Sequence, residues 1–167
     1  MTTNYCLFLP KKKKLKTIII IPARYRSSRF PGKPLAKIAN KEMIIHVAEK
    51  CAKILPRKNI YVATENKLIF KVAKKYGFNS VITSAQCLTG TDRVAEVAKK
   101  IKANIYINVQ GDEPVINPRD ILKVLKEKQS NPNKVICGYT EILKSENPLN
   151  SNLVKVVFNK EKKLIYC

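Results

Sequence analysis

The chain has 167 residues, of which 45% are hydrophobic, and its 33 basic and 12 acidic residues give a formal net charge of +21. This length and apolar content suit one globular domain with a proper core. This charge would be typical of a nucleic-acid-binding protein. Most of the basic residues, however, are scattered lysines without interleaved aromatic residues or a binding motif, so we expect solvated lysine faces and no nucleic-acid partner. A basic RNA-binding protein is the alternative.

Residues 1–16 contain a short apolar stretch followed by four consecutive lysines. The apolar part is too short for a signal peptide or a membrane span, and the charge follows it instead of preceding it. We predict a loose N-terminal tail over 1–16 and one domain over 17–167. No other segment reaches membrane length, so a soluble protein without a membrane partner is expected.

The first predicted strand ends in a cationic loop. Ile18–Ile21 form an unbroken apolar run, typical of a strand buried on both faces in a parallel sheet, and Pro22 ends it by removing a backbone donor. Ligands bind at the carboxyl ends of strands in open α/β sheets. The loop at 23–34 contains cations suited to phosphate oxygens, namely Arg24, Arg29 and Lys33. A solvated basic loop is the alternative, and Pro34 excludes a Walker A loop.

The rest of the chain alternates helical and extended patterns. The predicted helices are residues 41–55, 68–76, 94–101 and 118–129. The predicted strands are residues 59–63, 80–83, 105–109, 135–139 and 153–158. This order predicts an α/β fold, a three-layer sandwich with a mainly parallel sheet. Residues 151–166 show strand, turn and strand without a helix, so mixed pairing is expected to begin there.

Residues 89–93 combine hydroxyl groups and Gly90 with the amino terminus of a predicted helix. Such a loop suits a base or ribose pocket. Thr89 and Asp92 are equally suited to a plain helix cap. The pattern leaves both interpretations open.

The turn at 110–114 follows a buried strand and contains Asp112, one of only three aspartates in the chain. Mg²⁺ in nucleotide sites is usually held by one or two carboxylates together with phosphate oxygens and water. Asp112 is therefore a candidate magnesium ligand opposite the cationic loop, and an ordinary type I turn is the alternative. The sequence shows no pair of nucleophile and base for covalent catalysis.

Cysteine and histidine usage points to a cytoplasmic protein. The five cysteines are widely spaced, without a Cys-x-x-Cys, and His46 is the single histidine. Reduced thiols are therefore expected, and a zinc site is not.

Together, the segments resemble the bacterial sugar-nucleotide cytidylyltransferases, most closely those that activate 3-deoxy-D-manno-octulosonate (KDO). The motifs that carry the resemblance lie at successive strand ends over residues 17–167: Ile-Ile-Pro-Ala-Arg-Tyr at 20–25, Pro-Gly-Lys-Pro at 31–34, Val-Ala-Thr at 62–64, Thr-Gly-Thr-Asp-Arg at 89–93, Asn-Val-Gln-Gly-Asp-Glu-Pro at 108–114 and Val-Lys-Val-Val at 154–157. Each alone is weak, but their order is specific. The resemblance implies a nucleotide-diphospho-sugar-transferase-like sheet.

The resemblance also implies a reaction and its residues. The anomeric hydroxyl of KDO would attack the α-phosphate of CTP, giving CMP-KDO and pyrophosphate with Mg²⁺, in lipopolysaccharide biosynthesis. The residues that would bind CTP are Ala23, Arg24, Ser28, Lys33, Gly90, Thr91 and Arg93. Gln110 would contact the sugar and Asp112 would carry the metal, so that Arg24, Lys33 and Asp112 form the catalytic set.

The chain departs from the family pattern at residues 40–43, at Cys87, after the second strand and in length. A usual Thr-Asp after the second strand is Thr64-Glu65 here. Family members also continue for roughly eighty residues, so the resemblance implies that the C-terminal portion of the domain is missing, with a second metal carboxylate and much of a homodimer interface. A CTP-binding remnant or fragment without turnover is therefore the alternative to an active enzyme.

Overall fold

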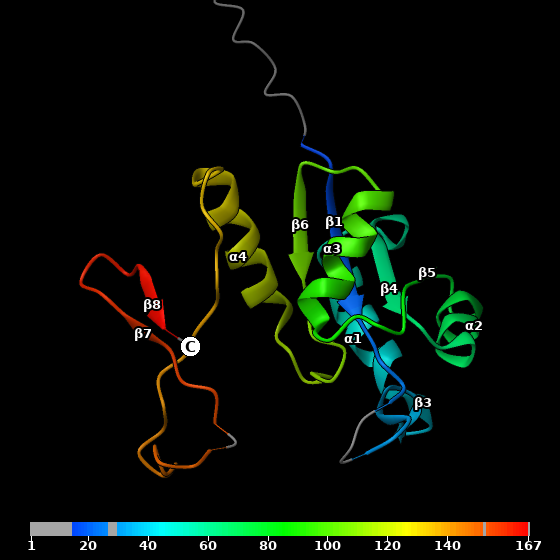
Figure 1. Ribbon diagram of the computed structural model, residues 1–167, viewed down its shortest axis with the longest axis horizontal. Coiled ribbons are helices and arrows are strands. Elements are labelled where there is room, and N and C mark those ends of the chain that lie inside the picture. Colours follow the sequence, from blue (N-terminus) through cyan, green and yellow to red (C-terminus); the bar gives the residue numbers. More distant parts are fainter. Residues whose placement is uncertain (1–14, 27–29, 152, 167) are drawn as a thin grey trace, which may run out of the picture.

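Four parallel strands form the central sheet of the computed structural model, which describes residues 15–26, 30–151 and 153–166 (Figure 1). The strands are β1 (Thr17–Pro22), β4 (Ile60–Thr64), β5 (Asn79–Ile82) and β6 (Ile105–Asn108), in the spatial order β5-β4-β1-β6. Ile20 of β1 is in register with Tyr61 on one side and Asn108 on the other. The predicted parallel sheet is confirmed, and the four isoleucines of β1 are fully buried at its centre.

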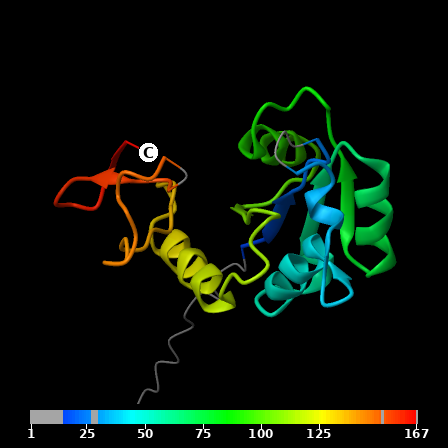
Figure 2. The ribbon, with the colours of Figure 1, turned by 90° about the horizontal axis from the view of Figure 1, so that it is seen from below.

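Helices cover both faces of this sheet and make three layers (Figures 1 and 2). Ile19 and Ile21 pack on the face that is covered by α1 (Met43–Ala52), α2 (Lys67–Lys75) and α4 (Pro118–Ser130). Ile18 and Ile20 point to the opposite face, which α3 (Gly90–Lys100) covers through Val97. Alternate side chains of one strand thus fill two cores, as expected for a strand buried on both sides.

The helix boundaries follow local signals. Asn66 caps α2, because its side-chain oxygen accepts from the Leu68 and Ile69 amides at 2.8 and 3.3 Å. The helix ends before Gly77, whose φ of 76° suits glycine. Helix α1 begins two residues later than predicted, since β3 (Lys41–Glu42) pairs with β2 (Lys37–Ile38) in a short hairpin. Single turns of 3₁₀ helix complete the body at η1 (Lys33–Leu35) and η2 (Arg57–Asn59).

The segment after α4 differs from the prediction. Residues 135–139 form no strand among the described residues, and the expected strand at 153–158 shortens to β7 (Val157–Phe158), which pairs antiparallel with β8 (Leu164–Tyr166). This pair lies away from the central sheet, beyond α4 (Figure 2). The strand prediction at 135–139 is wrong here because a strand needs a neighbouring ladder, and no described strand lies beside this segment. Its apolar residue Val135 is 96% exposed.

Two of the remaining predictions concern the termini and the membrane. The predicted tail lies outside the described residues except for Leu15 and Lys16, which are exposed. Within the described ranges, none of the helices combines the length and apolar character that crossing a membrane requires.

Candidate active site

The loops after β1, β5 and β6 meet at the carboxyl edge of the sheet and enclose a cleft of about 700 Å³. Seven of the nine predicted site residues line this cleft: Ala23, Arg24, Lys33, Gly90, Arg93, Gln110 and Asp112. Thr91 is exposed on the first turn of α3 and is not among the lining residues. Ser28, like the predicted phosphate ligand Arg29, lies outside the described residues.

A close backbone approach joins the turn after β6 to the end of β1. The Val109 amide donates to Ile20 O at 3.1 Å, which continues the pairing of β6 with β1 past its last residue. Gly111 follows, and a Cβ there would lie 2.7 Å from Pro22 O and 3.1 Å from Ile44 Cδ1. Only glycine fits this position, and its close packing places Gln110 and Asp112 over the end of β1.

The cationic loop folds back over the same edge. The Ala23 amide donates to Ala63 O at 2.8 Å, and the Gly32 amide donates to Tyr25 O at 2.8 Å, closing the loop on itself. Gly32 has a φ of 72°, and a Cβ there would lie 3.3 Å from the Tyr25 ring. The 3₁₀ turn η1 begins directly afterwards, so Lys33 stands at the closed end of the loop and faces the turn after β6.

Lys33 and Asp112 form an ion pair across the cleft, with 2.7 Å between Lys33 Nζ and Asp112 Oδ2. Their side chains are 37% and 53% exposed. A pair this exposed contributes little stability, so both groups remain available to a ligand at small cost. The structure therefore brings together the predicted phosphate ligand and the predicted metal ligand, which in this state bind each other.

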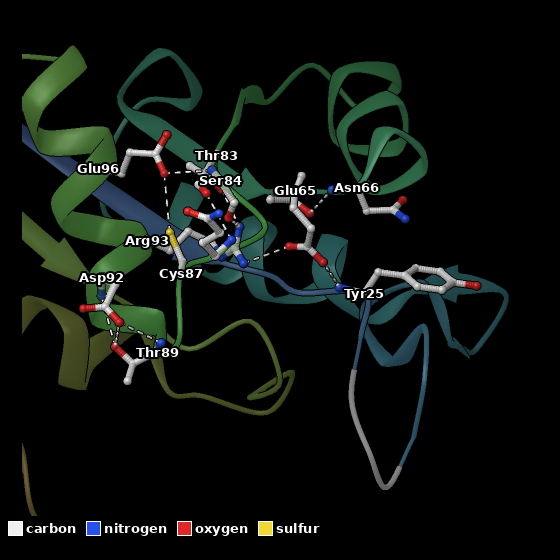
Figure 3. Close-up of polar contacts among 12 residues, drawn as sticks. Tyr25, Glu65, Asn66, Thr83, Ser84, Cys87, Thr89, Asp92, Arg93 and Glu96 are labelled. Carbon is white, nitrogen blue, oxygen red and sulfur yellow. Dashed lines mark hydrogen bonds and ion pairs between the residues drawn. The ribbon is translucent and has the colours of Figure 1, made fainter.

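The loop before α3 is a helix cap and also part of the cleft. Thr89 Oγ1 accepts from the Asp92 amide at 3.1 Å, and Asp92 Oδ2 accepts from the Thr89 amide at 2.8 Å (Figure 3). The Thr89 amide and the Thr89 hydroxyl both donate to Asp92 Oδ2 and hold the pKa of Asp92 below its usual value. The capping interpretation is thus confirmed for Thr89 and Asp92. Gly90 lies on the cleft side, where a Cβ would approach Pro22 Cγ to 3.2 Å and Gln110 Oε1 to 3.4 Å.

Arg93 is buried, with only 3% of its surface exposed, although it also lines the cleft. Its guanidinium donates to Thr83 Oγ1 and, at 3.4 Å, to Ser84 O. It also forms an ion pair with Glu65, which has 2.9 Å between Arg93 Nη2 and Glu65 Oε2 (Figure 3). Arg93, which was predicted as a nucleotide ligand, therefore connects the end of β5 to Glu65 at the end of β4.

Glu65 is the residue that sequence reasoning missed. It follows β4 at the carboxyl edge of the sheet, and its Oε1 accepts from the Tyr25 amide at 2.7 Å. The signal in the sequence was its position directly after a predicted strand, where site residues of α/β sheets lie. Glu65 and Tyr25 line a second cavity of about 360 Å³, which shares Arg24, Cys87 and Arg93 with the larger cleft.

The surroundings of Cys87 favour its neutral thiol form. Burial and a hydrogen bond to Glu96 both raise its pKa above the ordinary value, and the Sγ to Glu96 Oε2 distance is 3.4 Å. Glu96 in turn accepts from Lys100 Nζ at 2.7 Å and from the Ser84 amide at 2.8 Å. These bonds lower the pKa of Glu96 to about 2. The raised pKa disfavours the reactive thiolate of Cys87, which lines the cleft. Like Cys87, the described cysteines Cys51 and Cys137 are free thiols.

Sequence comparison places these features among known proteins. The chain is 37% identical to the 3-deoxy-manno-octulosonate cytidylyltransferase of Escherichia coli over 151 residues, which cover 90% of this chain and 61% of the relative. It is 40% identical to that of Geobacter metallireducens, with 91% and 60% covered. For the mitochondrial enzyme of Arabidopsis thaliana the identity is 38%, with 93% and 54% covered. The chain thus spans less than two thirds of the length of these relatives.

Structure comparison agrees. A solved CMP:2-keto-3-deoxy-manno-octonic acid synthetase in complex with CTP superimposes with a TM-score of 0.68 at 42% identity, over 71% of this chain and 49% of the other. The bifunctional IspDF of Campylobacter jejuni, at 15% identity and a TM-score of 0.56, shares the fold. The family model described as cytidylyltransferase matches residues 18–167. This chain therefore belongs to the cytidylyltransferase family.

Proposed function

We propose that the chain forms the nucleotide-binding part of a 3-deoxy-manno-octulosonate cytidylyltransferase, which transfers CMP from CTP to KDO and releases pyrophosphate for lipopolysaccharide biosynthesis. The observation that carries the proposal is the 2.7 Å pair of Lys33 and Asp112 at the mouth of the cleft that Gly90 and Gln110 also line. The relatives named above support the choice of CTP and KDO.

In this proposal the two sides of the cleft bind different parts of CTP. Arg24 and Lys33 lie on the cationic side and bind the triphosphate through charge-assisted hydrogen bonds. Gly90 lies on the α3 side, where the absence of a side chain lets the nucleoside approach the backbone. The Ala23 amide already donates to Ala63 O. The backbone group of Ala23 that can bind the amino group of cytosine is therefore the Ala23 carbonyl.

The reaction needs no covalent enzyme intermediate. The anomeric oxygen of KDO forms a bond to the α-phosphorus, the bond from this phosphorus to the bridging oxygen breaks, and pyrophosphate leaves with the electron pair. The hydroxyl proton passes to solvent water. Lys33 and Arg24 offset the negative charge that gathers on the phosphate oxygens, and Gln110 orients the sugar.

Asp112 suits Mg²⁺ as one ligand of a shared site. Its carboxylate is half-exposed and faces the side of the cleft assigned to the phosphates. No cluster of three or more metal-binding side chains occurs within the described part of the chain, so phosphate oxygens and water would complete the ligand set. Bound Mg²⁺ supplies charge stabilisation at the phosphates. Lys33 then exchanges its bond to Asp112 for one to a phosphate oxygen.

A second candidate is a CTP-binding protein without turnover. It is favoured by one observation, namely that the chain spans 54% to 61% of the relatives named above. Both candidates share the nucleotide site, and they differ only in product formation.

One preparation separates the candidates. Calorimetric titration with CTP and a coupled assay for pyrophosphate release with CTP, KDO and Mg²⁺ are run on the same protein, with a full-length relative as the positive control. Binding with release supports the enzyme, and binding without release supports the second candidate. Absence of CTP binding contradicts both, and salt-sensitive binding of arbitrary RNA would instead support the basic RNA-binding alternative. Sedimentation of the same sample tests whether this chain forms the homodimer that the resemblance implies for full-length family members.

A further inference from the structure

One carboxylate joins loops that come from separate strands. Glu65, at the end of β4, accepts the Tyr25 amide of the cationic loop at 2.7 Å through Oε1. Its other oxygen lies 2.9 Å from Nη2 of Arg93, on the first turns of α3. Figure 3 shows these two contacts on opposite oxygens of the same side chain. Through these two contacts, Glu65 connects the cationic loop on the phosphate side of the cleft to α3 on the nucleoside side.

Arg93 extends the connection to β5. Its guanidinium donates to Thr83 Oγ1 and to Ser84 O, just past the end of that strand. Planar guanidinium groups offer several donors in a fixed arrangement, which a lysine amine cannot reproduce. The ends of β4 and β5, the cationic loop and the start of α3 are therefore held by one pair of side chains.

Burial makes this pair different from the other ion pairs of the described residues. The side chains of Arg93 and Glu65 are 4% and 15% exposed, whereas the partners elsewhere are all at least a quarter exposed. Removing one partner of a buried pair leaves an uncompensated charge that the surroundings must relieve by moving. Here the groups next to the pair are the Tyr25 amide of the cationic loop and the start of α3.

The geometry also shows which contact orients Glu65. Oε2 has no hydrogen-bond donor among the described residues, although Arg93 Nη2 lies 2.9 Å away, so that contact is attraction between charges without aligned hydrogen-bond geometry. The directional bond is the one from the Tyr25 amide to Oε1. The position of the cationic loop thus depends on the Glu65 carboxylate directly.

We propose that Glu65 is a positioning residue, which sets the separation between the cationic loop and α3 and so the affinity of the cleft for CTP. This inference rests on the proposed function. Glu65 itself is not assigned a contact with substrate. It acts through Tyr25 and Arg93, and the chemistry that it serves is recognition of a nucleoside triphosphate whose phosphates and nucleoside bind on opposite sides of the cleft.

The test compares Glu65→Gln, Glu65→Asp and the matched control Glu49→Gln. Glu49 also forms an ion pair, at 2.8 Å with Lys41, but neither residue lines the cleft. CTP affinity is measured by calorimetry, thermal unfolding by scanning calorimetry, and hydrogen exchange of the Tyr25 amide by NMR. Glu65→Gln should weaken CTP binding by about tenfold, which corresponds to about 1.4 kcal/mol, because the Tyr25 amide loses its charged acceptor and the cationic loop shifts. It should also speed exchange of the Tyr25 amide.

Rescue separates positioning from general stability. Glu65→Asp keeps the charge and should restore most of the CTP affinity and of the Tyr25 protection, while Glu49→Gln should leave both at the parent values. If CTP affinity falls equally in Glu65→Gln and Glu49→Gln, or does not change in Glu65→Gln, the positioning role is wrong. Should Glu65→Gln not fold, Arg93→Lys replaces it: faster Tyr25 exchange with weaker CTP binding supports the connection, and parent values for both overturn it.

Failure of the proposed function has a different signature. A parent protein that binds no CTP contradicts the proposed function whatever Glu65 does. In that case the Tyr25 exchange rates still decide the structural half of the inference, since faster exchange in Glu65→Gln with rescue by Glu65→Asp supports it and equal rates in all variants overturn it.

Discussion

Lys33 and Asp112 are 79 positions apart in the sequence, yet Lys33 Nζ and Asp112 Oδ2 lie 2.7 Å apart across the mouth of the cleft. Neither residue is held there by the other, because each is fixed by its own backbone: Gly32 and η1 on one side, and Gly111 against Pro22 on the other. Their pairing shows that the cleft can hold a positive and a negative group at one point, as phosphate and metal binding require.

Replacement of Lys33 by alanine should weaken CTP binding without unfolding the protein. A hydrogen bond to a charged group contributes about 1.5–3 kcal/mol, which corresponds to about 10- to 100-fold in the dissociation constant. The control is Lys123→Ala, because Lys123 forms a similar exposed ion pair with Asp120 at 3.1 Å on α4. Calorimetric titration checks the prediction, and equal CTP affinity in both variants would count against the phosphate assignment.

Asp112→Asn should separate binding from turnover. The variant loses the carboxylate proposed for Mg²⁺, so metal-dependent pyrophosphate release should fall by at least about 100-fold, given a metal contribution of several kcal/mol. CTP binding without metal should be as tight or tighter, because Lys33 is no longer paired. Asp120→Asn serves as the control, and retained turnover in Asp112→Asn would refute the metal role.

Gly111→Ala should destabilise the fold. Its Cβ would lie 2.7 Å from Pro22 O, and relief of such overpacking costs about 1–3 kcal/mol. Gly138→Ala is the matched control, since its Cβ would meet Val124 Cγ2 at an ordinary 3.7 Å and should change stability by less than about 0.5 kcal/mol. Urea unfolding measures both free energies. Equal values would mean that the turn after β6 can move away from β1.

How far the site could be predicted depends on the range of the interactions that form it. The Ile18–Ile21 run specifies a doubly buried strand by composition alone, and the carboxyl ends of parallel strands must share one edge, so the grouping of Lys33 with Asp112 followed from strand order. Glu65 could not be identified in this way, because a glutamate after a strand is ordinarily solvated. Its role arises only from the Tyr25 amide and Arg93, which come from distant parts of the chain.

The wrong strand at 135–139 has a related cause. The segment has the composition of a strand, with Val135 and Tyr139 among its residues, but pairing depends on a partner that local sequence does not specify. Tyr139 instead packs against Phe158, with 4.7 Å between the ring centroids and 41° between the ring planes. The cap at Thr89 could be predicted, because a helix cap depends only on neighbouring residues, and Thr89 and Asp92 form the capping box.

Stability should depend on Glu96 in a defined pH window. Bonds from Lys100 and Ser84 lower its pKa from 4.5 to about 2, so the folded state favours the ionised form. The stabilisation is fully present above about pH 4.5 and is lost as the pH falls toward 2. The gap in unfolding free energy between the parent and Glu96→Gln should therefore shrink over this window, as followed by urea unfolding at successive pH values. A constant gap would contradict the assignment.

The central claim is that CTP binds in the cleft between the cationic loop and α3, and NMR titration of the ¹⁵N-labelled protein with CTP tests it most directly. The amides of Ala23, Gly90, Gln110 and Gly111 should shift in a saturable manner, while that of Gly138 stays in place. Saturable shifts confined to residues outside the cleft, or no shifts at millimolar CTP, would contradict the account.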